Sequence, residues 1–159
     1  VLETIHTIYI PIRQDELTYV GTQLPLYNLK TMLFGNDNWL DMEILNQEVI
    51  GPHVQGMRII SDVSSAMSST YDDAFTNYYA LAMDHASFVQ SIINLGVMNR
   101  RQFMDKLRNH EGFHGEHTSI QFSGANRNEN GFAQVLEYNR KKLKNIGVYD
   151  GKTFNQPSE

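Results

Sequence analysis

Hydrophobic and polar positions alternate between strand-like and helix-like patterns along the first third of the chain. Short runs rich in β-branched and aromatic residues predict three buried strands, at residues 5–12, 30–34 and 57–63. Helices are predicted between them, from Glu16 to about Leu24 with Asp15 as N-cap, and over 41–49. Strands that alternate with helices indicate βαβ units, and therefore a mainly parallel sheet flanked by helices in three layers.

The pattern changes to helix in the middle of the chain and returns to strand near the end. Apolar residues at helical spacing predict a helix over 71–95, closed by Gly96, and a second one that Asn99 caps and that runs to about Arg108. Strands are predicted at 119–122, 133–138 and 143–149, with a hairpin turn over 139–142 between the last two. Asp150 and Gly151 predict a further turn.

Composition narrows the classes of protein to which the chain can belong. With 159 residues, 41% of them hydrophobic, it can bury a core, and its net charge of -5 argues against a nucleic-acid partner. Basic residues cluster only at Arg140, Lys141, Lys142 and Lys144, which indicates a solvated hairpin edge. The chain has no cysteine, which excludes disulfides and thiolate metal sites, and no run reaches the roughly 18 apolar residues of a membrane span.

One short motif suggests metal chemistry. Residues 110–114 read His-Glu-Gly-Phe-His, which matches the pattern of zinc proteases with two histidines four apart and a glutamate between them. That chemistry needs a continuous helix, and Gly112 and Gly115 favour a loop because glycine weakens a helix interior. His117 offers a third ring nearby. The favoured interpretation is a solvated loop after a helix, so we expect no functional metal at His110, His114 and His117. No phosphate-binding, nucleophile-elbow or dinucleotide fingerprint is present, and no cofactor is expected.

Polar residues follow the predicted parallel strands at the points where these strands end. Ligands of open α/β sheets bind outside the carboxyl ends of the strands. The candidate ligand contacts at these ends are Pro11, Arg13, Asn36, Asp37, Trp39 and Asp62. Arg13 can pair with a carboxylate in bidentate fashion. Trp39 has two open interpretations: an aromatic surface for the ligand, or a ring that covers the end of the sheet.

The order of these segments resembles a known family. The runs IYIP at 8–11, QLPLY at 23–27 and LFGNDNW at 33–39 are similar to the second lobe of type I periplasmic binding proteins. That family includes the receptors of branched-chain amino acid ABC transporters. Further similar segments are VQGMRIIS at 54–61, the helix start at 75–79, AMDHA at 82–86 and the loop GFHGEHTSIQF at 112–122. In the last one, His117 stands where the family pattern has a glycine.

The resemblance implies a non-catalytic module that binds an amino-acid-like solute in the periplasm or in an outer-membrane-anchored position. It covers only the C-terminal half of a two-lobed receptor, so the chain is expected to be a fragment of a longer protein. Within one unit spanning 1–159, residues 1–63 and about 125–159 would belong mainly to the second lobe. Residues from about 64 to 124 would pack toward the first lobe. Hinge strands are expected near 61–64 and Gly124, with lobe closure as the working motion.

Two alternatives remain open from the sequence. The QLPLY and Trp39 regions are also similar to domains of envelope lipoproteins that activate penicillin-binding proteins, which implies an envelope protein as partner instead of a solute. The zinc hydrolase based on residues 110–114 is the less favoured alternative. A chain that lacks the first lobe is expected to expose sheet edges and apolar helix faces, which predicts a homodimer. We expect no nucleic-acid partner and no membrane span within this chain.

Overall fold

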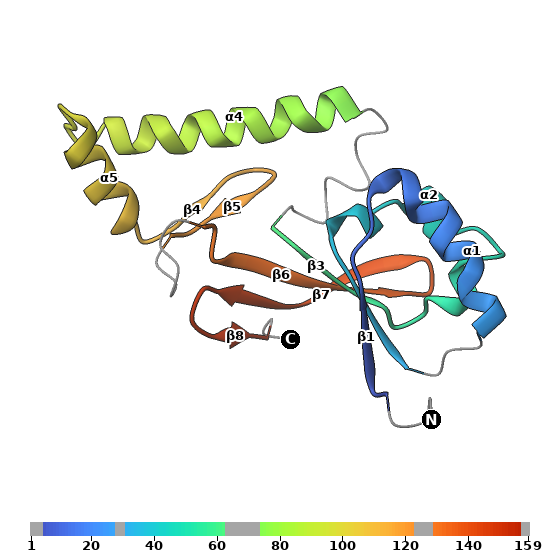
Figure 1. Cartoon of the computed structure of the whole chain (residues 1–159). Helices are drawn as coiled ribbons and strands as arrows, with labels where there is room; N and C mark the ends of the chain where they lie inside the picture. Colours follow the sequence, from blue (N-terminus) through green and yellow to red (C-terminus); the bar gives the residue numbers. More distant parts are fainter. Residues whose placement is uncertain (1–4, 28–30, 63–73, 123–128, 157–159) are drawn as a thin grey trace. The chain divides into compact units, whose positions relative to one another are not determined.

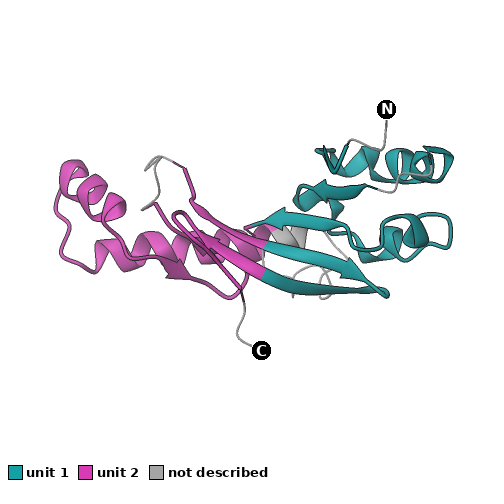
Figure 2. Cartoon of the chain, turned by 90° about the horizontal axis from the view of Figure 1, so that it is seen from below, with its two compact units in different colours: residues 1–61, 135–146 teal, residues 62–134, 147–159 magenta. Residues whose placement is uncertain are grey.

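The computed structural model describes residues 5–27, 31–62, 74–122 and 129–156 (Figure 1). The chain divides into two compact units, which are coloured separately in Figure 2. Unit 1 comprises residues 1–61 and 135–146, and unit 2 comprises residues 62–134 and 147–159. The assignment of segments to two lobes stays a prediction, and the expected hinges lie largely outside the described residues.

Unit 1 begins with the predicted alternation of strands and helices. Strands β1 (Thr7–Ile10), β2 (Met32–Gly35) and β3 (Arg58–Ser61) are neighbours in one sheet. The strands pair in parallel, with Ile10 opposite Gly35 and Gly35 opposite Ile59. The connections contain helices α1 (Leu17–Tyr27) and α2 (Met42–Leu45) and the 3₁₀ turns η2 (Gln14–Glu16), η3 (Asp37–Trp39) and η4 (Gly51–His53). The carboxyl ends of these strands therefore lie at one edge.

Hairpins complete a six-stranded sheet in the order β1-β2-β3-β6-β7-β8. Strands β6 (Phe132–Asn139) and β7 (Lys142–Asp150) are joined by a two-residue turn, as predicted, and β7 pairs antiparallel with β8 (Phe154–Asn155). The turn residues Arg140 and Lys141 have φ angles of 49° and 63°. Positive φ at both positions matches the right-handed twist of the flanking strands. The expected α/β fold is confirmed, with a mixed sheet.

The core of unit 1 lies between its strands and the helices α1 and α2. Its buried members come from α1, β2, η3, α2, β3, β6 and the segments that connect them, namely Ile12, Leu17, Leu24, Leu33, Trp39, Leu45, Ile50, Val54, Met57, Ile59, Leu136 and Tyr138. Trp39 is 0% exposed and is the largest of them. Its ring and the side chain of Met57 occupy the space where a Cβ on Gly35 would point, so only glycine fits at that position. The packing of Trp39 and Met57 therefore requires a glycine at the end of β2.

Unit 2 is built on two helices and a small ribbon. Helix α4 (Ala74–Ile93) is followed by α5 (Arg100–Arg108), and strands β4 (Phe113–His114) and β5 (Ser119–Ile120) pair antiparallel. The Asn99 side chain accepts a hydrogen bond from the Gln102 N–H (3.0 Å), which confirms the predicted cap. Phe88, Ile92 and Ile120 form the buried centre of this unit. Residues 113–114 were expected in a loop, but backbone pairing with 119–120 makes them a strand.

Two local predictions in unit 1 were wrong. Asp15 does not cap α1: the turn η2 precedes the helix, and the Glu16 carboxylate instead accepts from the Arg13 N–H (2.9 Å). Helix α2 is much shorter than the predicted 41–49, although Asp41 does cap it by accepting from the Ile44 N–H (3.0 Å). The chain turns tightly after it, with Ile50 and Gly51 both bonded to the Gln47 carbonyl. This turn buries Ile50 completely, and core packing therefore overrides helix propensity here.

In the part of the chain that the structure describes, no helix is both long enough and apolar enough to cross a membrane. The exposed face of α4 does carry large apolar side chains, including Tyr78, Tyr79 and Met83. The homodimer expected from such faces stays a prediction.

Candidate ligand-binding site

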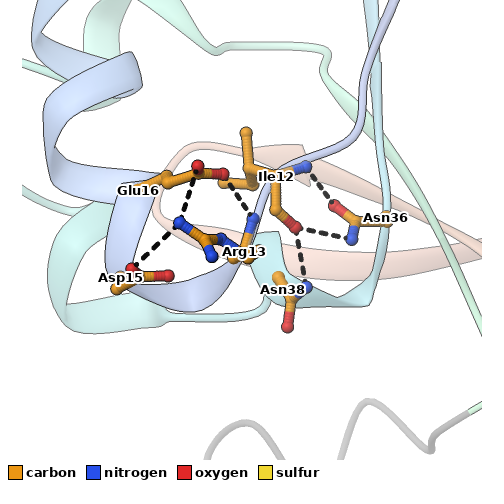
Figure 3. Close-up of polar contacts among 6 residues, drawn as sticks. All are labelled: Ile12, Arg13, Asp15, Glu16, Asn36 and Asn38. Carbon is orange, nitrogen blue, oxygen red and sulfur yellow. Dashed lines mark hydrogen bonds and ion pairs between the residues drawn. The ribbon is translucent and has the colours of Figure 1, made fainter.

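The loops that follow β1 and β2 are tied together at the carboxyl edge of the sheet (Figure 3). The Asn36 amide accepts from the Ile12 N–H (3.1 Å) and donates to the Ile12 carbonyl (2.8 Å). The Asn38 amide donates to the same carbonyl (2.7 Å). These side chains extend the pairing of the two strands beyond their ends, so Asn36 positions the first loop. Asn38 belongs to the LFGNDNW run at 33–39. The sequence does not show, however, that its partner is Ile12, which lies 26 residues earlier.

Trp39 lies beneath this edge and not on its surface. Its indole N–H donates to the Ile10 carbonyl (2.9 Å), and the ring is fully buried. An indole needs such a partner when it is buried. Of the two interpretations left open by the sequence, the structure shows the ring that covers the end of the sheet.

Three of the predicted contacts follow β1 and β2 and are exposed: Pro11, Arg13 and Asp37. The Arg13 guanidinium lies 3.2 Å from a Glu16 oxygen and 3.5 Å from an Asp15 oxygen, and its side chain is 74% exposed. The pKa of Glu16 is lowered, first by the hydrogen bond from the Arg13 N–H and also by the charge of the guanidinium. Exposed ion pairs are weak and rearrange easily, so Arg13 can exchange these carboxylates for another.

Asp62 follows β3 directly, belongs to unit 2 and is held by contacts within that unit. Its carbonyl accepts from the Thr118 hydroxyl (3.0 Å), and its carboxylate accepts from the Asn130 amide (3.3 Å). The side chain is exposed, so the carboxylate keeps room for further hydrogen bonds.

A buried carboxylate in unit 2 was missed by sequence reasoning. Asp84 on α4 is 7% exposed and accepts hydrogen bonds from the N–H groups of Glu116 (3.2 Å), His117 (2.6 Å) and Thr118 (2.9 Å). Burial acts to raise the pKa of Asp84, but these three donors together lower it below its ordinary value. The carboxylate also fills the space beside Gly115 where a Cβ would point. Asp84 therefore fixes the 115–118 turn on the helix.

The residues of the metalloprotease-like motif do not lie on a helix. Helix α5 ends at Arg108, Gly112 has a φ of 129°, and His114 belongs to β4. The His110 ring accepts from the Gly112 N–H (3.1 Å), and the His114 ring lies 3.0 Å from the Ser119 hydroxyl. The two rings thus have separate local partners. Within residues 5–27, 31–62, 74–122 and 129–156, no three histidine or acidic residues are grouped to hold a metal ion.

Comparison with solved structures identifies the fold. The leucine-binding protein LivK of Thermotoga maritima superposes with a TM-score of 0.54 at 13% identity, covering 91% of this chain and 45% of that one. The branched-chain amino acid binding protein LivJ of Streptococcus pneumoniae, solved with isoleucine, gives 0.52 at 18% identity, covering 96% and 45%. The chain has the fold of type I periplasmic binding proteins. It spans a little under half the length of each neighbour.

At these identities the likeness establishes the fold alone. No protein-family model and no curated protein matches the chain.

Proposed function

We propose that this chain forms part of a non-catalytic receptor for a small, amino-acid-like solute in the bacterial cell envelope. The observation that carries the proposal is the carboxyl edge of β1 and β2, where Asn36 and Asn38 fix the loop that contains Arg13. In open α/β sheets this edge is where ligands bind. The neighbours in fold, which bind leucine and other branched-chain amino acids, support the same class of ligand.

The exposed charges at this edge suit a zwitterion. Arg13 would bind the solute carboxylate through two parallel N–H donors after releasing Glu16 and Asp15. Asp37 begins η3 and is exposed, so it would accept from the ammonium group. Pro11 supplies an apolar contact, and Trp39 supports the loops from below. Asp62 belongs to unit 2, and its role as a ligand contact stays a separate prediction.

Calorimetric titration of the 159-residue chain with L-isoleucine tests this proposal, with L-isoleucinamide as the ligand that lacks the carboxylate. We expect isoleucine to bind and the amide to fail. The variant Arg13→Gln should weaken isoleucine binding by about tenfold or more, because a charge-assisted hydrogen bond contributes roughly 1.5–3 kcal/mol. Arg101→Gln on α5, also exposed, is the matched control and should leave binding unchanged.

Two results would contradict the proposal. One is the absence of heat with isoleucine, leucine and valine while circular dichroism shows the folded chain. The other is equal binding of isoleucine and its amide, which would remove the role of Arg13. Recovery of the protein in the envelope fraction of cells is the separate test of the proposed location.

A further inference from the structure

A cavity of about 330 Å³ lies in unit 1, away from the carboxyl edge described above. Its walls include Pro52 and Gln55 before β3, and Tyr138, Arg140 and Lys141 at the β6–β7 turn. The Tyr138 N–H donates to the Met57 carbonyl (2.9 Å), and the Gly56 N–H donates to the Tyr138 carbonyl (2.8 Å). These bonds place the cavity beside the beginning of β3, whereas the proposed solute edge is at the ends of the parallel strands.

The cavity walls are held by hydrogen bonds between segments far apart in the sequence. The buried Tyr138 hydroxyl donates to the Leu45 carbonyl (2.8 Å). The Gln55 amide donates to the Gly51 carbonyl (2.8 Å) and accepts from the Arg140 N–H (2.8 Å). The cavity is therefore formed before any ligand arrives, and its volume lies near the lower end of the range of roughly 300–1,000 Å³ for small-molecule sites.

The rim of this cavity carries positive charge in a chain of net charge -5. Arg140 and Lys141 both line it, and neither forms an ion pair with a carboxylate of the described residues. Glu48 lines it as well and is exposed. The burial of Tyr138 raises the pKa of its phenol, which therefore stays neutral near pH 7. The lining thus contains two cationic residues and one anionic residue, and its other residues are uncharged.

The backbone of the turn is strained at these two cationic residues. Arg140 and Lys141 adopt φ angles of 49° and 63°, where Asn-Gly is the preferred pair in a two-residue hairpin. The preferred residues would relieve the strain and remove both cations from the rim. Strained positions of this kind often mark functional sites.

We propose that this cavity binds a small organic anion that has an apolar body. The body packs against the exposed Pro52, with the buried Tyr138 beneath it, and the anionic group is bound by Arg140 and Lys141. Glu48 weakens the attraction and disfavours ligands of higher negative charge. This site is independent of the proposed solute site at the carboxyl edge.

Titration of the ¹⁵N-labelled chain with benzoate, at fixed ionic strength and followed by NMR, tests the proposal. Benzamide, of similar shape but uncharged, is the comparison ligand. Benzoate should shift the amides of 46–55 and 138–141 and saturate, while benzamide should bind about tenfold more weakly or not at all. The variant Glu48→Gln should bind benzoate more tightly.

The double variant Arg140→Asn/Lys141→Gly removes both cations and suits the turn, so it should fold and lose benzoate binding by about tenfold or more. The matched control Lys142→Gln/Lys144→Gln removes two charges next to the turn and should keep most of the binding. The proposal is overturned if benzoate causes no saturable shifts, if benzamide binds equally well, or if both double variants lose binding alike.

Discussion

The cores of the two units differ in their number of fully buried apolar residues. In the described part of the chain, the core of unit 1 has twelve buried residues contributed by strands, helices and turns alike, whereas the centre of unit 2 has three. Partly buried rings such as Phe103 and Phe113 pack against the centre of unit 2. Its long helix meanwhile leaves Tyr78 and Tyr79 exposed. We therefore expect the apolar core to supply most of the stability of unit 1. Unit 2 is expected to depend more on individual polar contacts, such as those of Asp84.

The largest effect should come from the core of unit 1. Trp39→Ala removes the largest buried side chain and leaves a cavity, so we expect a loss of about 4 kcal/mol of unfolding free energy. Trp39→Phe keeps much of the packing but loses the bond to the Ile10 carbonyl, and should cost less. Urea denaturation measures both variants. A loss below about 1 kcal/mol for Trp39→Ala would contradict a well-packed core.

The second effect concerns the carboxylate that anchors unit 2. Asp84→Asn replaces an acceptor of three N–H groups with an amide whose own N–H₂ faces one of these donors. We expect a loss of about 2 kcal/mol, since hydrogen bonds to charged groups are the strong ones. Hydrogen exchange should become faster in α4 and the 115–118 turn and stay unchanged in β1–β3. Unchanged exchange in unit 2 would show that this contact is dispensable.

The same carboxylate predicts a pH dependence. The folded-state pKa of Asp84 is lowered, so its contribution to stability is complete above the unfolded value of about 3.9 and is lost as the pH falls through the lower folded value. Urea midpoints between about pH 5 and 2 should fall for the native chain, and the fall should be smaller in Asp84→Asn. Parallel curves for the two proteins would contradict this origin of the acid sensitivity.

A smaller effect of opposite sign is expected at the β6–β7 turn. Arg140→Asn/Lys141→Gly replaces two residues of positive φ by the pair that such turns prefer, and should raise the unfolding free energy by about 1 kcal/mol. Thermal unfolding measures the gain. A loss of stability would mean that the two long side chains pack more than their backbone angles cost.

The smallest effect should occur at the proposed solute edge. Arg13→Gln removes only exposed ion pairs with Asp15 and Glu16, so the unfolding free energy should change by less than about 0.5 kcal/mol. A loss above about 1 kcal/mol would show that Arg13 supports the fold, and would make it a poor ligand contact.

Local patterns in the sequence determined most of the elements. The Asn99 cap joins residues three apart, and the β6–β7 hairpin needs only a two-residue turn, so both could be predicted. Glycine in the 110–114 motif predicted that the helix would end, and α5 does end at Arg108. The hydrophobic runs were enough to predict the order of the first three strands and of the two helices between them.

Tertiary structure alone decided which polar groups meet. Asn36 and Asn38 reach Ile12 across 24 and 26 residues, Asp84 reaches the 116–118 segment across 32 to 34, and Gln55 reaches Arg140 across 85. No local rule contains these pairings, because they depend on how strands and helices pack after they form. The same packing buried Trp39. The sequence favoured equally a ring that contacts a ligand and a ring that covers the end of the sheet, and only its complete burial in the folded core decides for the second.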